Sequence, residues 1–124
     1  KDSLNSIVIE LYSNAKQPTI KSIEKAQLLD AIIPGLGHWY AGYFWEGAAS
    51  LGLNLASIAF VGYNFYTRFY ITTFTLGTNI LQTFYIGGMN RAEFLVNKSN
   101  YQRKKKYNDG LRRAVLNISN LAFP

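Results

Sequence analysis

The chain has 124 residues, which suits a single domain with short appendages. It carries 13 Lys and Arg against 7 Asp and Glu, for a formal net charge of +6, and it has no Cys and one His. A disulfide framework and a cysteine metal site are therefore excluded. A single His also disfavours a His-cluster metal site and a Ser-His-Asp triad, although one catalytic His is not excluded.

Residues 1–25 predict an amphipathic helical flank. Leu4, Ile7, Val8 and Leu11 follow the spacing of one helix face, and the segment from Asn14 to Pro18 ends that helix. The first 30 residues balance four Lys against four acidic residues. These 30 residues are therefore neutral together, and the net charge of the chain comes from elsewhere.

The next segment predicts a short helix that is sharply broken. Gln27 to Ile33 is apolar enough for a helix, and Pro34 and Gly35 then interrupt it, because Pro removes a donor and Gly permits positive φ. Gly37 and Gly42 allow further close turns. This stretch is too short to span a bilayer, so we expect a re-entrant or interfacial segment that folds back onto the following helices.

Charges are almost absent from the middle of the chain. Between Ala31 and Asn90 only Glu46 and Arg68 are charged, which leaves charge-free runs of 21 and 22 residues. Each run forms a helix of about 30 Å, the thickness of a hydrocarbon core. Residues 26–90 therefore predict an all-α membrane hairpin of two transmembrane helices, Tyr43–Gly62 and Phe69–Met89, with an ion pair between Glu46 and Arg91 at its mouth.

Aromatic residues cluster at both ends of the predicted spans, as expected for interfacial belts. The first belt contains Trp39, Tyr40, Tyr43, Phe44 and Trp45, and the turn contains Tyr63, Phe65, Tyr66, Phe69 and Tyr70. A soluble, aromatic-rich helical bundle is the alternative. It stays open because the second span carries several Thr, Asn and Gln residues.

Small and polar residues recur every three or four positions in both spans. Such stripes let helix backbones approach closely in lipid, and Asn79 would add a hydrogen bond worth about 1 kcal/mol. We expect the hairpin to pack one stripe of each span against the other: Ala48, Gly52 and Ala56 against Thr75, Asn79, Thr83 and Gly87. A second stripe, Ser50, Asn54 and Ser57, points away and needs another partner or lines a polar path.

One stretch resembles a known family. Pro34, Gly35, Gly37, Tyr40 and Gly42, followed by Gly47 and Asn54, match the pattern PGxGxxYxG…G…N. This pattern is similar to that of small bacterial membrane hairpins, many from the Bacteroidota, and of two-transmembrane-domain proteins. The resemblance covers about residues 20–108, implies a membrane hairpin and says little about activity. Family members often carry Gln where His38 stands and a small residue near Asp30, so a special role for these two residues stays open.

Residues 91–124 predict basic amphipathic helices that hold eight Lys and Arg against two acids. The densest run is Arg103, Lys104, Lys105 and Lys106. Anionic lipid headgroups attract such cations by about 1 kcal/mol each, and an acidic partner protein is the alternative. Nucleic acid is disfavoured because the aromatic residues lie in the spans rather than among the cations.

The predicted function is non-enzymatic, because no metal-ligand set, phosphate loop or catalytic constellation is present. We expect a membrane-anchored accessory subunit of a bacterial cell-envelope assembly, of the secretion or protein-insertion type, without a cofactor or a small-molecule substrate. Its partners would be membrane lipids and larger membrane subunits. The alternatives are a lipid-interacting or small-solute membrane protein with a path along Ser50, Asn54 and Ser57, and a hydrolase that uses His38.

The predicted location is a bacterial membrane. Two spans return the chain to its starting side, so both flanks share one compartment. The positive-inside rule places them in the cytoplasm if the hairpin lies in an inner membrane. Because the sequence starts at Lys1 rather than Met, a removed signal peptide is the other expectation, which would place the hairpin in an outer membrane with periplasmic flanks.

Overall fold

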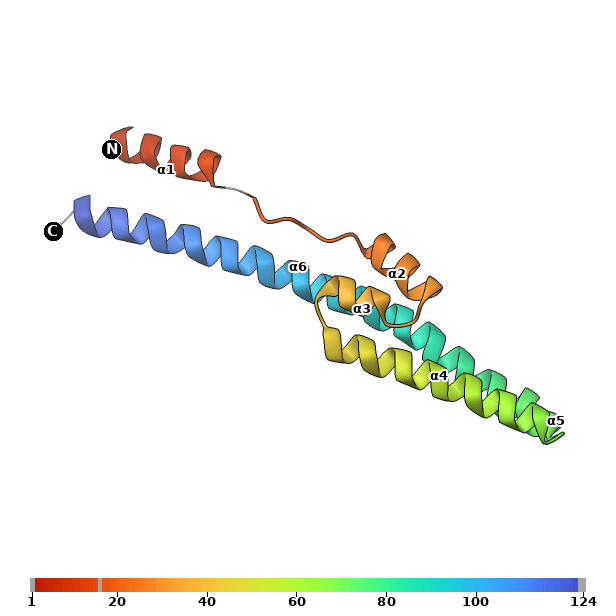
Figure 1. The fold of residues 1–124 in the computed structure, drawn as a ribbon. Helices are drawn as coiled ribbons and strands as arrows, with labels where there is room; N and C mark the ends of the chain where they lie inside the picture. Colours follow the sequence, from red (N-terminus) through yellow and green to blue (C-terminus); the bar gives the residue numbers. More distant parts are fainter. Residues whose placement is uncertain (1, 16, 123–124) are drawn as a thin grey trace. The chain divides into compact units, whose positions relative to one another are not determined.

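The computed structural model describes residues 2–15 and 17–122, and every regular element in this part of the chain is helical (Figure 1). This confirms the predicted all-α class. In chain order the elements are α1 (Asp2–Asn14), α2 (Ile23–Ile32), α3 (Leu36–Ala41), α4 (Phe44–Tyr66), α5 (Tyr70–Thr72), the π-helix η1 (Thr73–Gly77) and α6 (Thr78–Ala122).

The chain divides into two compact units. The hairpin unit comprises Lys21–Ser99 and contains α2 to η1 and the first part of α6. The flank unit combines residues 1–20 and 100–124, and so contains α1 and the last part of α6.

In the hairpin unit, α4 and the first part of α6 run side by side in opposite directions (Figure 1). The chain reverses at Thr67–Phe69, close to the predicted turn, and Arg68 adopts a left-handed φ of 65°. The Thr67 hydroxyl donates to the Tyr63 carbonyl at 2.9 Å, which satisfies one of the acceptors left free at the end of α4.

In the described residues one helix, α4, is long and apolar enough to cross a bilayer. The second predicted span, Phe69–Met89, is divided among α5, η1 and α6, and its Thr, Asn and Gln residues lower its hydropathy. Helix length and composition therefore support one span and do not confirm a pair.

The two helices meet through different faces from those predicted. Asn54 and Ser57 are each 4% exposed, whereas Gly52 and Gly87 have open space where a Cβ would be. The predicted pairing of the Ala48, Gly52 and Ala56 stripe with the Thr75, Asn79, Thr83 and Gly87 stripe is therefore wrong. Close approach occurs instead at Gly77, where a Cβ would lie 2.9 Å from Val61 Cγ2, and at Gly88.

The polar residues of the stripe on the second predicted span are satisfied within their own helix. Thr75, Asn79 and Thr83 are exposed, and their side chains donate to the carbonyls of Ile71, Thr75 and Asn79 respectively. This back-bonding to the residue four positions earlier removes the need for a partner on α4. Conversely, the stripe of Ser50, Asn54 and Ser57, which was predicted to lack a partner within the hairpin, faces α6.

The small core of the hairpin unit joins α2 and α3 to α6. Ala26, Ala41, Leu95 and Val96 are buried together, and Ile23, Tyr40 and Tyr43 contact them. The Tyr40 hydroxyl accepts a hydrogen bond from the Ser22 amide at 3.1 Å, and Ser22 in turn caps α2 by accepting from the Lys25 amide. The predicted short helix and its break at Pro34 and Gly35 are confirmed.

The C-terminal region differs from the prediction of separate helices. α6 continues as one helix of 45 residues through Asn108, Asp109 and Gly110. A single Gly in a helix costs only about 1 kcal/mol relative to Ala, and the runs 103–106 and 111–114 on either side consist of good helix formers.

Within the flank unit, hydrogen bonds connect the two chain segments. Arg103 Nη1 donates to the Thr19 carbonyl at 3.0 Å and to the Thr19 hydroxyl at 3.1 Å, and the Tyr107 hydroxyl donates to the Ala15 carbonyl at 3.4 Å. α1 leaves Ile9 and Tyr12 exposed. Arg103 therefore makes its contacts within the flank unit, whereas Lys104, Lys105 and Lys106 are exposed.

Replacement of Gly37 by Ala tests the close approach of α3 to α2. The new Cβ would collide with the backbone carbonyl of Ala26 and lie 2.9 Å from Ala92 Cβ, so we expect Gly37→Ala to lower the free energy of unfolding by about 3 kcal/mol. Gly52→Ala, in open space, should raise it by up to about 1 kcal/mol. Equilibrium unfolding of the purified protein followed by circular dichroism measures both values, and equal effects would contradict this packing.

Candidate functional site

A buried carboxylate holds the break between α2 and α3. Asp30 Oδ1 accepts hydrogen bonds from the amides of Gly35 at 2.8 Å and Gly37 at 3.1 Å, and it lies 3.1 Å from His38 Nδ1. Asp30 is 1% exposed and His38 is 2% exposed. Since Oδ1 already accepts from two amides, this contact is a hydrogen bond when His38 carries its ring proton on Nδ1.

The glycines of the motif are required by steric contacts. Gly35 has a φ of 101°, and a Cβ on it would collide with the Gly47 carbonyl oxygen. A Cβ on Gly47 would in turn collide with the Trp39 ring. Gly42, also at φ 101°, ends α3 in the left-handed conformation that glycine favours. Pro34, next to Gly35, lies in the break itself.

In the described residues, the second oxygen of this carboxylate and one nearby hydroxyl are buried without a hydrogen-bond partner. They are Asp30 Oδ2 and Ser50 Oγ. Both face Gly88 on α6, where a Cβ would lie 3.1 Å from each atom. An unsatisfied buried polar group typically costs about 1–3 kcal/mol, so their position next to a pocket calls for a physical explanation.

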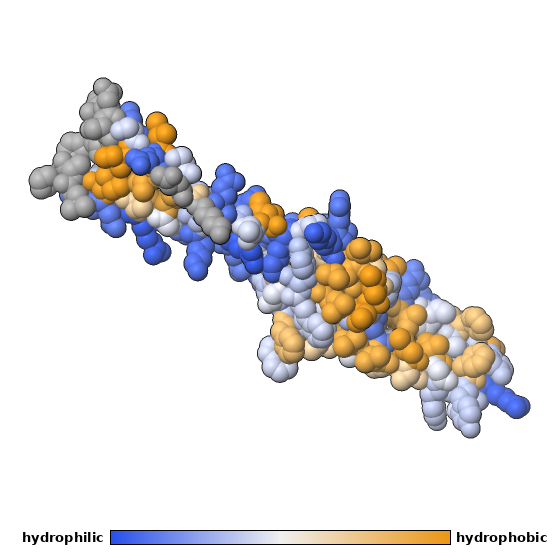
Figure 2. Space-filling view, turned by 45° about the horizontal axis from the view of Figure 1, so that its top comes forward, coloured by the Kyte–Doolittle hydropathy of each residue, from blue (hydrophilic) through white to orange (hydrophobic). Residues whose placement is uncertain are grey.

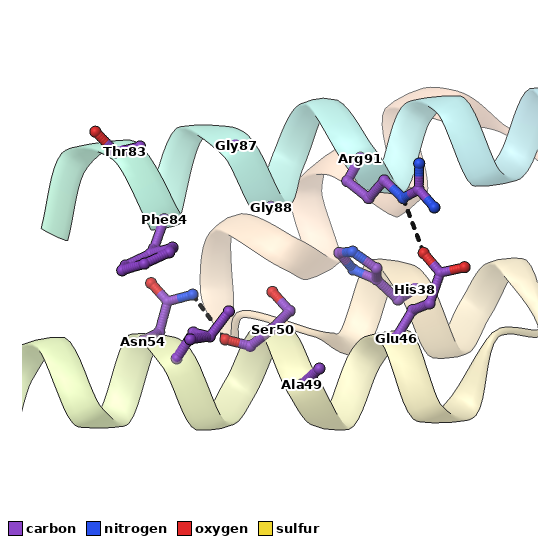
Figure 3. A pocket seen from close by; sticks show the side chains of 11 residues that line it. His38, Glu46, Ala49, Ser50, Asn54, Thr83, Phe84, Gly87, Gly88 and Arg91 are labelled. Atoms are coloured by element: carbon purple, nitrogen blue, oxygen red, sulfur yellow. Dashed lines mark hydrogen bonds and ion pairs between the residues drawn. The ribbon is translucent and has the colours of Figure 1, made fainter. Parts of the chain in front are cut away.

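A pocket of about 270 Å³ lies between α4 and α6 next to these atoms (Figure 3). At one end Arg91 Nε donates to Glu46 Oε2 at 2.8 Å, which confirms the predicted ion pair. The remaining lining is mostly apolar or uncharged. It consists of His38, Ala49, Ser50, Leu53, Asn54, Thr83, Phe84, Gly87 and Gly88.

The structure brings together only some of the predicted site residues. Ser50 and Asn54 line the pocket, and the Asn54 amide donates to the Ser50 carbonyl at 2.9 Å. Ser57 is buried, donates to the Leu53 carbonyl at 2.7 Å and does not line the pocket. The basic run from Arg103 to Lys106 belongs to the flank unit.

The role of Asp30 is the feature that the sequence analysis left unassigned. Its hydrogen-bond partners lie five, seven and eight residues later, around a Pro-Gly break. That spacing matches neither a helix nor a strand, so periodicity does not detect it. In the described part of the chain no group of three or more His, Cys, Asp or Glu side chains could hold a metal ion.

Substitution of Asp30 measures the contribution of this carboxylate. Asp30→Ala leaves two buried amides and His38 without their acceptor, so we expect the unfolding free energy to fall by about 3 kcal/mol. Asp30→Asn keeps an acceptor oxygen and should cost roughly half as much. The matched control is Glu24→Ala, an exposed acid on the same helix, which should change stability by less than about 1 kcal/mol. A Glu24→Ala effect as large as that of Asp30→Ala would disprove the role of Asp30.

No protein-family model, curated protein or solved structure matches this chain. The resemblance of the Pro34 to Gly42 motif to bacterial membrane hairpins therefore stays a prediction from the sequence. The geometry of the hairpin unit and the chemistry of its surface carry the functional argument.

Proposed function

We propose that this chain is a membrane-anchored, non-enzymatic accessory subunit of a bacterial cell-envelope assembly. In this proposal the hairpin of α4 and the first part of α6 lies in the bilayer, and the flank unit meets larger partner subunits at the membrane surface. The observation that carries the proposal is the apolar, unpartnered outer surface of the hairpin.

The outer surface of the hairpin is rich in large apolar and aromatic side chains (Figure 2). Only 17% of the most apolar stretch of α4 is buried within the structure, which is unlike the core helix of a soluble protein. The exposed set includes Leu53, Leu55, Ile58, Phe60, Phe65, Ile71, Phe74, Leu76 and Ile86. A contiguous apolar surface of this kind is typical of a membrane or protein contact.

Polar side chains of the hairpin already have acceptors inside it. Asn54, Ser57, Asn64 and Thr83 each donate to the carbonyl four residues earlier in their helix. In a bilayer core every polar group must be satisfied internally, and this pattern meets that requirement for most of the hairpin. The Glu46–Arg91 pair lies at one end of α4, next to Trp39 and Trp45, as expected at the headgroup level.

The partner proposal rests on the flank unit. Ile9 is 68% exposed and Tyr12 is 55% exposed on α1, and Lys104, Lys105 and Lys106 are exposed on α6. Anchored chains that lack catalytic groups commonly act by holding other proteins. An apolar helix face beside a basic run offers both a packing surface and attraction to anionic headgroups or acidic proteins.

Single-cysteine labelling tests membrane insertion, and the absence of native Cys makes it clean. Leu55 is exposed in the middle of α4. In membranes whose bilayer is intact, the Leu55→Cys thiol should react with a membrane-impermeant maleimide at least about tenfold more slowly than the control thiol, because the bilayer excludes water and disfavours the thiolate. Asn108→Cys, exposed in the flank unit, is the matched control and should react in membranes opened on its side.

Detergent should abolish the protection of Leu55→Cys. Equal labelling of both variants in membranes opened on the side of Asn108, together with release of the chain by alkaline carbonate, would refute insertion.

Purification of the tagged full chain in mild detergent tests the partner role. We expect a larger protein to accompany it in a fixed ratio. Ile9→Asp should reduce that ratio several-fold, by charging the apolar face of α1. Ser13→Asp, on an exposed polar position of the same helix, is the control and should leave it unchanged. A chain that elutes alone, or that loses its companion equally in both variants, would refute the partner role of α1.

A further inference from the structure

The pocket between α4 and α6 is large enough for an apolar ligand. Its volume is about 270 Å³, whereas an engineered protein cavity of roughly 150 Å³ takes up benzene. Much of its wall is apolar, from Ala49, Leu53 and Phe84, and glycines supply another part. The apolar part of this wall favours an apolar occupant.

The chemistry of the pocket changes along its length (Figure 3). The Glu46–Arg91 ion pair and His38 lie toward one end, and Leu53, Asn54 and Phe84 toward the other. From Glu46 to Asn54 is eight residues of α4, or about 12 Å. A change from a charged end to an uncharged end over this distance resembles the change from headgroup to hydrocarbon in a lipid.

Ser50 supplies a free hydrogen-bonding group inside the pocket. Its hydroxyl is buried and has no partner, and in Figure 3 it points from α4 toward Gly88. Other hydroxyls of the hairpin, such as those of Ser57 and Thr83, donate to carbonyls of their own helix. Ser50 therefore has a donor that the protein leaves unpaired, next to the equally unpaired acceptor Asp30 Oδ2.

We propose that this pocket binds the part of one lipid acyl chain next to its carboxyl or ester group, with this hydrocarbon against Leu53 and Phe84 and the carboxyl or ester oxygen accepting from Ser50 Oγ. The proposal rests on the proposed membrane location of the hairpin, because the bilayer supplies the ligand. It adds a defined site with a ligand class to a chain otherwise proposed to anchor and assemble.

Two alanines of α4 provide a matched test. Ala49 and Ala56 are both exposed and lie seven residues apart on one helix face, and only Ala49 lines the pocket. The probe is palmitic acid with a diazirine in its chain, added to the purified full chain in mild detergent. We expect saturable labelling that drops at least about fivefold in Ala49→Phe, because the ring fills the pocket, and is unchanged in Ala56→Phe.

The labelled site gives a readout that needs no variant. In the wild-type chain the cross-link should map to the peptides that contain Leu53 and Phe84. Ser50→Ala should weaken labelling, whereas Ser57→Ala, outside the pocket, should not. Competition by unlabelled palmitic acid would identify a free fatty acid as the ligand, and competition by 1-palmitoyl-lysophosphatidylcholine would identify an esterified chain.

Three results would overturn the proposal: labelling that does not saturate, cross-links spread along the outer face of α4, or equal labelling of Ala49→Phe and Ala56→Phe. If Ala49→Phe loses its helical circular dichroism, the wild-type cross-link map decides alone. The maleimide protection of Leu55→Cys reports insertion separately, so failure of lipid binding is distinct from failure of the membrane proposal.

Discussion

The hairpin unit depends on one buried carboxylate. Asp30 lies near the end of α2 and accepts from amides on the far side of the Pro34 break, so a helix that Pro and Gly interrupt is held in a fixed fold. Without this acceptor, the Gly35 and Gly37 amides would be buried and unpaired. Gly35 in turn contacts Gly47 in the first turn of α4, so the carboxylate also holds the backbone against which the long helix packs.

The interior and the exterior of the hairpin differ sharply in chemistry. Inside, Asn54 and Ser57 are buried and bonded to their own helix, and Ser50 and Asp30 keep one free polar atom each. Outside, many large apolar side chains are exposed. A soluble protein has the reverse distribution of polar and apolar side chains. This difference supports both the membrane anchoring and the assignment of the pocket as a lipid site.

Local signals predicted the break at Pro34 and Gly35, because the conformational limits of Pro act on neighbouring residues. They also predicted the Glu46–Arg91 pair, because isolated charges lie at the ends of the predicted spans. The choice of packing face was not predictable in the same way. α4 carries two stripes with suitable spacing, one through Gly52 and one through Asn54, and helical periodicity treats them alike. Contacts of α3 with Gly47 and of η1 with Val61 select the Asn54 face, and these are tertiary contacts.

The π-helical turn η1 gives the returning helix an extra residue just before α6. If this turn relaxed to α-helical hydrogen bonding, everything after it would rotate by about 100° and advance by one position. Gly87 would then occupy the place opposite Ser50 that Gly88 holds now. Because the two glycines are adjacent, a one-residue slip of the helix would meet no new Cβ at this crossing. At Gly37, however, the slip would put Arg91 in the place of the buried Ala92, so the contact between α3 and α6 holds the present alignment.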